Sequence, residues 1–147
     1  MYHYTDSGLD NIYLKNGFKR HKTLYGEGIS ITDTDGLHRA IGKMLIETPK
    51  PLNGAEVRFL RIQLDLSQKR LADLLGTGEQ AVRRWEKYRS KAIPGPEDRL
   101  LRQLYSEYIG GDGTLRDIVQ RLADLDIQPP ERICMNDTDH GWEVQVA

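Results

Sequence analysis

LSQKRLADLLGTGEQAVRRWE, residues 66–86, places two short stretches with helical spacing on either side of a glycine turn. Ser67 is a good N-cap for the first helix, and Gly76 is expected to end that helix. A second helix is expected from Glu79 to about Arg89. Two short helices joined by a tight turn predict a helix-turn-helix. The apolar positions of the first helix are Leu71, Ala72 and Leu75.

The second of these helices has two chemically different faces. At about 100° per residue, Trp85 and Gly78 fall on the same side as Val82, and we expect this side to face the core. The opposite side carries hydrogen-bonding side chains: Gln80, Arg83, Arg84 and Lys87. Arg suits guanine, Gln suits adenine and Lys suits the phosphate backbone. The outer face therefore predicts DNA binding.

The same stretch resembles the Xre-type, phage-repressor-like helix-turn-helix family, whose pattern runs roughly L-(S/T)-Q-x-x-L-A-x-x-L-G, then an apolar residue, Ser or Thr, and finally (I/V)-x-x-(W/Y/L)-E. The resemblance implies that Gln68 contacts a phosphate or a base. It also implies that Arg61 pairs with Glu86, a contact we interpret as structural. The matching residues are Leu66, Ser67, Gln68, Leu71, Ala72, Leu75, Gly76, Val82, Trp85 and Glu86.

The sequence departs from the family pattern at two places. Thr77–Gly78 stands where the pattern has an apolar residue and then Ser or Thr, but Gly is nearly as good an N-cap. Ala81 replaces a common polar residue and is suited to touching a thymine methyl group. Arg89 and Lys91 follow the helix, where we expect phosphate contacts. The candidate DNA-binding residues are Gln68, Thr77, Glu79, Gln80, Arg83, Arg84, Lys87, Arg89 and Lys91, and the structural ones are Arg61, Trp85 and Glu86.

The N-terminal part of the chain contains short β-prone stretches followed by a helix. Short stretches at 12–14, 23–26 and 28–32 predict two or three strands. A helix follows from Leu37, with Asp33 or Asp35 as its N-cap. The tyrosines of this part are either an interface patch or packing for that helix; they are Tyr2, Tyr4, Tyr13 and Tyr25.

The remaining pattern is helical up to a C-terminal hairpin. Residues spaced by three and four predict further helices before and after the central pair; their apolar positions are Val57, Leu60 and Leu64, then Leu100, Leu101, Leu104, Tyr105 and Tyr108, then Leu115, Ile118, Val119 and Leu122. The last helix is expected from Thr114 to about Leu125, and a hairpin turning within Asn136–Gly141 ends the chain. The fold class is mainly α with small β parts: a five-helix Xre-type domain with an N-terminal β-rich and α extension and a C-terminal β-hairpin.

The expected organisation has four parts. Residues 1–48 form an N-terminal α/β segment that is a candidate for partner binding, and residues 49–53 a proline-containing linker. Residues 54–126 form the helix-turn-helix domain, and residues 127–147 hold the hairpin, a candidate for dimerisation. Positive charge is concentrated in the first part of the helix-turn-helix domain, because residues 54–92 hold 9 basic and 5 acidic side chains whereas the chain as a whole carries −1.

Composition excludes several classes of protein. Hydrophobic residues make up 38% of the 147, with no apolar run long enough to cross a membrane and no secretory signal. The single cysteine, Cys134, rules out an internal disulfide framework, and we expect a cytoplasmic location and a buried position for this residue. No nucleophile–base pair or phosphate loop occurs, so an enzyme is the least expected class.

Metal and cofactor sites are also not expected. The stretch around DTDG at 33–36 has neither the glycine nor the final glutamate of a calcium loop at the required spacing, so a helix cap is the favoured interpretation. The histidines and the cysteine share no metal-ligand spacing; they are His3, His21, His38, His140 and Cys134.

The order of parts also resembles MqsA-type antitoxins, in which an N-terminal segment binds a toxin and the C-terminal part dimerises on an operator. That family holds zinc through paired cysteines, and residues 1–50 contain no cysteine. The resemblance implies an autorepressor of a toxin–antitoxin operon that binds an inverted-repeat operator as a homodimer, with a toxin as partner. The alternative is a stand-alone transcriptional repressor that senses a small molecule or has no partner toxin.

Overall fold

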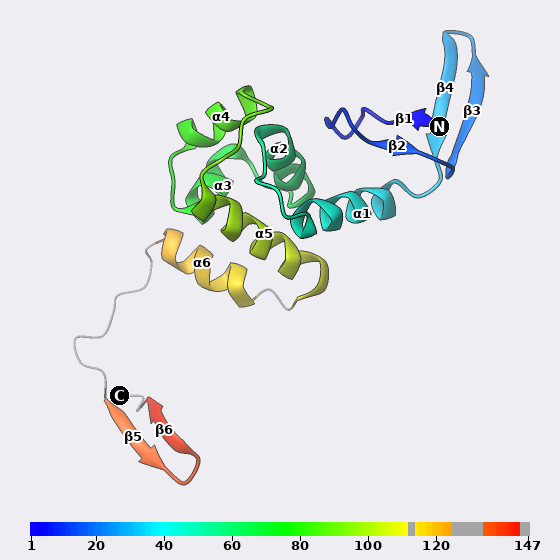
Figure 1. Cartoon of the computed structure of the whole chain (residues 1–147). Coiled ribbons are helices and arrows are strands. Elements are labelled where there is room, and N and C mark those ends of the chain that lie inside the picture. The colour runs from blue at the N-terminus through cyan, green and yellow to red at the C-terminus, as the bar shows by residue number, and fades with distance from the viewer. Residues whose placement is uncertain (112–113, 125–133, 145–147) are drawn as a thin grey trace.

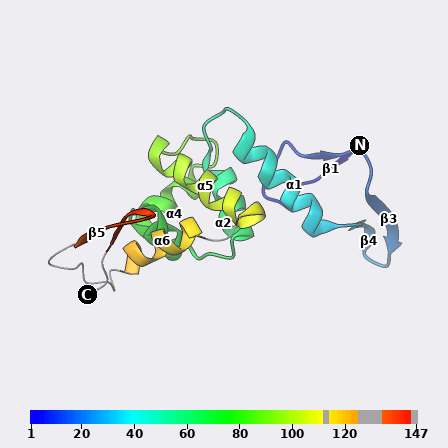
Figure 2. The ribbon, with the colours of Figure 1, turned by 90° about the horizontal axis from the view of Figure 1, so that it is seen from below.

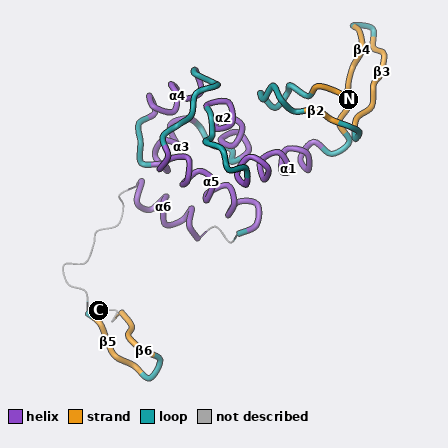
Figure 3. The backbone as a smooth tube through the Cα atoms, viewed as in Figure 1, coloured by secondary structure: helices purple, strands orange, loops and turns teal. Residues whose placement is uncertain are grey.

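The computed structural model describes residues 1–111, 114–124 and 134–144. Within these ranges the chain forms six helices and three two-stranded antiparallel sheets (Figures 1 and 3), so the expected fold class, mainly α with small β parts, is confirmed. The helices are α1 (Thr34–Glu47), α2 (Gly54–Gln63), α3 (Gln68–Leu75), α4 (Glu79–Lys87), α5 (Gly95–Gly110) and α6 (Thr114–Asp124). The strands are β1 (Tyr2–His3), β2 (Tyr13–Leu14), β3 (Phe18–Thr23), β4 (Gly26–Ile31), β5 (Met135–Thr138) and β6 (Gly141–Val144).

The helices α2 to α5 enclose one apolar core. The expected stripe of α2 is confirmed, since Val57 and Leu60 are fully buried and Leu64 nearly so. Leu71 of α3 and Leu101 of α5 are equally inaccessible. Each buried side chain of this size contributes about 1.5–3 kcal/mol of transfer free energy, so this cluster is the main source of stability.

Local capping sets where the helices begin and end. The Asn53 side chain and Glu56 form a capping box at the start of α2. Gly76 ends α3 in the left-handed conformation (φ 72°), which glycine adopts without steric cost. For α1, Asp33 rather than Asp35 is the N-cap, because its carboxylate accepts the Gly36 N–H at 3.0 Å.

Residues 49–53, expected as a linker, are fastened to α5. Leu52 is 1% exposed, and its N–H donates to the Asp98 carboxylate at 2.8 Å. Arg102, one turn along α5, donates to the carbonyls of Ile46, Thr48 and Lys50. These bonds satisfy carbonyls that the C-terminal end of a helix otherwise leaves unpaired. The connection between α1 and α2 is therefore fixed.

The first fourteen residues pack against the helical bundle. Tyr4 and Leu9 are buried in the same core cluster as the helices. The Tyr4 hydroxyl lies 2.7 Å from His38 Nε2, and burial, reinforced by the Asp6 charge, raises the pKa of Tyr4. Tyr25, in contrast, is 99% exposed. Of the two interpretations of the tyrosines, packing against α1 holds for Tyr4. Tyr25 does not pack on that helix, and an interface role for it stays a prediction.

The expectation of a strand at 23–26 is wrong, because these residues form the turn between β3 and β4. Thr23 pairs with Gly26, which leaves Leu24 and Tyr25 at the tip. The Thr23 hydroxyl donates to the Gly26 carbonyl at 2.7 Å and accepts the Tyr25 N–H at 3.2 Å. Two apolar residues at a turn imitate a strand in the sequence pattern, since turns usually hold Gly, Asn or Asp.

Four expectations for the C-terminal part have mixed outcomes. The hairpin is confirmed, with β5 and β6 paired and its turn between Thr138 and Gly141. Cys134 is exposed, so its expected burial is wrong. In α6, Leu115 and Val119 pack against the core, but Ile118 and Leu122 are 52% and 68% exposed, because that face of the helix points away from α3 and α5. The expected helix end near residue 125 lies outside the described residues.

The β elements lie at opposite ends of the molecule. Both views place β3 and β4 beyond the N-terminal end of α1 (Figures 1 and 2), and Figure 1 places β5 and β6 beyond α6. The helical bundle between them carries α4 on its outer surface (Figure 1).

Candidate nucleic-acid interface

The turn between α3 and α4 fixes the start of α4. Ser67 begins α3 by accepting the Arg70 N–H at 3.0 Å, as expected for its N-cap role. After the left-handed Gly76, the Thr77 N–H donates back to the Ala72 carbonyl at 2.9 Å. Gly78 then caps α4 without a side-chain hydrogen bond. The turn therefore depends on backbone geometry, and the Thr77 hydroxyl is not used to cap α4.

The orientation of α4 agrees with the helical-wheel expectation. Val82 is fully buried, and Trp85 packs against the edge of the core. The opposite side is exposed and, with Tyr88, lines a shallow surface hollow. We call this surface the α4 outer face; its residues are Gln80, Arg83, Arg84 and Lys87.

The charges of the α4 outer face are not equivalent. Arg83 forms an ion pair with Glu79 one turn earlier, at 2.8 Å. Neither Arg84 nor Lys87 takes part in an ion pair among the described residues. The Lys87 ammonium lies 5.7 Å from the Tyr88 ring. Arg84 is therefore the guanidinium best placed to accept a new partner.

A buried ion pair joins α4 to α2. The Arg61 guanidinium donates to both carboxylate oxygens of Glu86, at 2.8 and 2.9 Å, which confirms the expected pairing. The Glu86 side chain is only 6% exposed. Gln68 also donates to this carboxylate, at 3.3 Å, so it is held partly within the protein. A two-pronged Arg–carboxylate contact fixes geometry as well as distance.

Backbone contact also fixes the C-terminal end of α4. A Cβ added to Gly54 would lie 1.7 Å from the Trp85 carbonyl oxygen, so the first turn of α2 touches the α4 backbone directly. Only glycine permits this approach. The contact and the Arg61–Glu86 pair together determine the angle at which α4 leaves the bundle.

Comparison with known proteins agrees with this geometry. Residues 57–98, from α2 to the start of α5, match the family model described as Helix-turn-helix. This segment is an Xre-type helix-turn-helix. No curated protein and no solved structure matches the chain. The match supports assignment of the protein as a DNA-binding transcriptional regulator. The matched family is a regulatory one and not a typical enzyme family.

The two cations that follow the helix-turn-helix have different surroundings. Arg89, expected at phosphate, donates to the carbonyl of Gly8, so the segment after α4 touches the N-terminal loop. Lys91 is exposed, with its ammonium 4.9 Å from the Tyr88 ring. Sequence spacing does not identify the Arg89 contact, because its partner lies 81 residues away. Lys91 therefore lies near the α4 outer face, beside Tyr88, whereas the Arg89 guanidinium is directed to the N-terminal loop.

Sequence analysis missed Tyr88 at this surface and Arg58 beside the Arg61–Glu86 pair. Arg58, on the exposed side of α2, lies 4.0 Å from the Glu86 carboxylate. Tyr88 is 47% exposed and lies between two lysine ammonium groups. Amphipathic spacing of α2 gives a signal for Arg58, whereas nothing in the local pattern distinguishes Tyr88.

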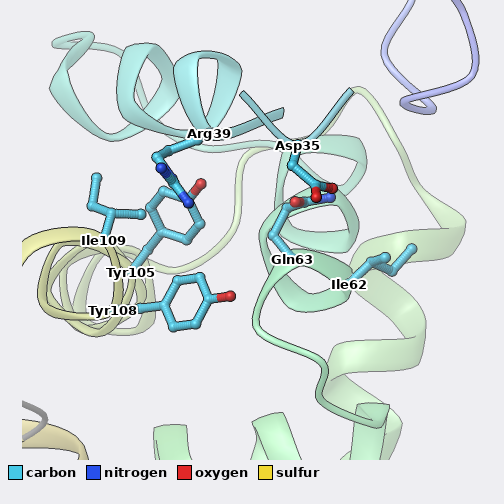
Figure 4. Close-up of a pocket in the computed structure, with 7 residues that line it drawn as sticks. All are labelled: Asp35, Arg39, Ile62, Gln63, Tyr105, Tyr108 and Ile109. Atoms are coloured by element: carbon cyan, nitrogen blue, oxygen red, sulfur yellow. The ribbon is translucent and has the colours of Figure 1, made fainter. Parts of the chain in front are cut away.

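A separate hollow of about 310 Å³ lies between α1, α2 and α5. Figure 4 shows Arg39 next to the Tyr105 ring, with Tyr108 facing the space between α5 and α2. Burial is the main cause that raises the pKa of Tyr105. The other lining residues are Asp35, Ile62, Gln63 and Ile109. Polar groups predominate, which suits a small polar molecule more than an apolar one.

Two further searches concern only the described residues. In that part of the chain, no three His, Cys, Asp or Glu side chains are grouped so as to hold a metal ion. No described helix is both long and apolar enough to span a membrane.

Proposed function

We propose that this protein is a sequence-specific autorepressor, the antitoxin of a type II toxin–antitoxin operon, which binds an inverted-repeat operator as a homodimer. The observation that carries the DNA-reading part is the exposure of Gln80, Arg83, Arg84 and Lys87 on one side of a helix whose other side is fixed to the core. A helix in the major groove presents such side chains to base edges.

The proposed site has two kinds of residue. Gln80, Arg83 and Arg84 read bases, whereas Lys87 and Lys91 contact phosphates. The remaining proposed contacts, around the edge of the same surface, are Gln68, Thr77, Glu79 and Arg89. Selection of bound sequences from a random DNA pool tests this assignment. We expect an enriched inverted repeat whose half-sites lie about one helical turn apart; a pool without enrichment contradicts sequence-specific binding.

Dimerisation is proposed through α6 and the C-terminal hairpin. One helix-turn-helix makes few base contacts, and a two-fold dimer doubles them. Exposed apolar side chains support this surface: Ile118 and Leu122 on α6, and Trp142 at 70% exposure on β6. Light scattering is expected to give twice the chain mass at micromolar concentration. A monomer with and without DNA contradicts the dimer.

The antitoxin role rests on the N-terminal part and on the resemblance in organisation. Co-purification of the untagged protein from native cells, followed by mass spectrometry, is expected to recover a small protein encoded in the same operon. Recovery of the dimer alone favours the second candidate, a stand-alone repressor that senses a small molecule. The hollow beside Tyr105 supports that candidate, because it is lined in part by α2, which pairs with α4 through Arg61.

A further inference from the structure

The β3–β4 hairpin is a second concentration of positive charge, separate from α4. Residues 15–31 carry Lys15, Lys19, Arg20 and Lys22 against a single acidic residue, Glu27. Lys19, Arg20 and Lys22 are all exposed. Glu27 lies 4.0 Å from Arg20, and both side chains are more than half exposed, so the pair neutralises little in water.

The register of the hairpin distributes these charges over both of its faces. Successive residues of a strand point to opposite sides, so Lys19 lies on one face, and Arg20 and Lys22 lie on the other. Cations on both faces suit a ribbon that lies along a polyanion and meets phosphates on either side.

The tip of the hairpin is apolar and fully accessible. Leu24 and Tyr25 are each 99% exposed. The Thr23 hydroxyl makes two hydrogen bonds across the turn. Apolar side chains that follow basic residues into a groove are a recurrent means of gripping DNA.

The position of the hairpin allows one duplex to meet both sites. In Figure 1, α4 lies on the outer surface of the helical bundle, and the hairpin lies beyond the N-terminal end of α1. Six residues of strand span about 20 Å, and a major groove recurs about every 34 Å along the duplex. A duplex that is seated on α4 and runs toward the N-terminal end of α1 meets the hairpin on its flank.

We propose that the β3–β4 hairpin is a second DNA-contacting element, which binds the phosphate backbone beside the half-site through Lys19, Arg20 and Lys22 and places Leu24 and Tyr25 against the adjoining groove. This inference rests on the proposed DNA-reading function and adds to it a contact that carries little sequence information. In this proposal the β3–β4 hairpin contributes to how tightly the protein binds DNA, and α4 determines which DNA sequence the protein binds.

The test uses the full chain and two duplexes of about 40 base pairs, one of random sequence and one enriched by the protein from a random pool. The variant is Lys19→Gln with Lys22→Gln, which removes one cation from each face. The matched control is Lys43→Gln with Arg99→Gln, two exposed cations on α1 and α5. All four side chains are exposed, so folding is expected to survive, and circular dichroism checks it.

The slope of log K against log salt is negative, and we expect the hairpin variant to reduce its magnitude by about 2 on both duplexes. Near 0.15 M salt this corresponds to roughly 10- to 50-fold weaker binding. The control pair is expected to leave the slope unchanged. Hydroxyl-radical footprints are expected to shorten on one flank of each half-site, and Tyr25→Ser to shorten the same flank with a smaller loss of affinity.

Parallel measurement of Arg84→Ala separates this inference from the proposed function. Suppose that Arg84→Ala no longer binds the enriched duplex, while the hairpin variant keeps the wild-type salt dependence and the wild-type footprint. The hairpin is then not a DNA contact, and only this inference fails. If the hairpin variant keeps DNA binding but loses a co-purifying protein, the hairpin is a protein-binding element and the inference is wrong. If the wild-type protein binds neither duplex, both proposals are overturned.

Discussion

The α4 helix and the β3–β4 hairpin both present exposed cations, but they are held in different ways. Val82, the Arg61–Glu86 pair and the Gly54 backbone contact join α4 to the core. The hairpin is held by its own ladder and, at its base, by the Tyr2 and Phe18 rings 5.4 Å apart. Reading bases requires side chains in fixed positions, whereas attraction to phosphate requires only charge. The difference therefore separates sequence recognition from general affinity.

Arg61→Ala is expected to have the largest effect, because it leaves the buried Glu86 carboxylate without its main partner. We expect the free energy of unfolding to fall by about 3 kcal/mol, near the lower end for a broken buried pair, since Gln68 still donates to Glu86. Urea denaturation measures the change. Arg58→Ala is the matched control on the same carboxylate, and its half-exposed side chain at 4.0 Å predicts little loss. Equal losses in both variants contradict a scaffold role specific to Arg61.

Gly54→Ala changes the angle of α4 without removing a charge. The added methyl group collides with the Trp85 carbonyl, so we expect about 1–3 kcal/mol of destabilisation together with weaker binding of the enriched duplex. Gly95→Ala is the control, because nothing lies within 4 Å of the position of its Cβ. Random-sequence binding through the hairpin is expected to change less than specific binding. An unchanged ratio of the two affinities contradicts the distinction drawn between α4 and the hairpin.

Arg84→Ala and Lys91→Ala compare base reading with phosphate contact at the edge of one surface. Losing an Arg–guanine pair worth about 1–3 kcal/mol weakens specific binding roughly 10- to 100-fold, with a much smaller loss on random DNA. Lys91→Ala is expected to weaken both duplexes equally and to lower the salt slope by about 1. Fluorescence anisotropy at several salt concentrations measures both. If Arg84→Ala weakens both duplexes equally, Arg83 becomes the better candidate for base reading.

The smallest effect is expected from the two hairpin turns, which have the same design. Thr23 and Thr138 each donate to a glycine carbonyl three residues on, at 2.7 and 2.8 Å. Replacing either by Ala is expected to cost no more than about 1 kcal/mol, because both hydroxyls are exposed to water. Amide hydrogen exchange is expected to accelerate in the altered hairpin alone. Accelerated exchange in α4 of Thr23→Ala contradicts the independence of the hairpin.

These two turns also mark a limit of sequence interpretation. The sequence TDHG, residues 138–141, holds the polar residues typical of a turn, and the C-terminal hairpin was predicted correctly. Residues 23–26, TLYG, make the same turn, but Leu24 and Tyr25 gave them the pattern of a strand. The sequence pattern shows that Leu24 and Tyr25 are apolar, but it does not show that both side chains project into solvent.

The sequence alone determined the helix-turn-helix, because its determinants are local. Ser67, Gly76 and the spacing of the apolar residues set two helices, and each acts within about one turn of the chain. It also predicted the Arg61–Glu86 pair, through the family resemblance, and the exposed side of α4.

Only the tertiary structure decided how the other parts join this unit. Arg102 holds the end of α1, Arg89 reaches Gly8, and Tyr4 meets His38; each pair is separated by more than thirty positions. Such contacts depend on where whole helices lie relative to one another. That placement follows from burial of the shared core, and no local pattern of residues records it.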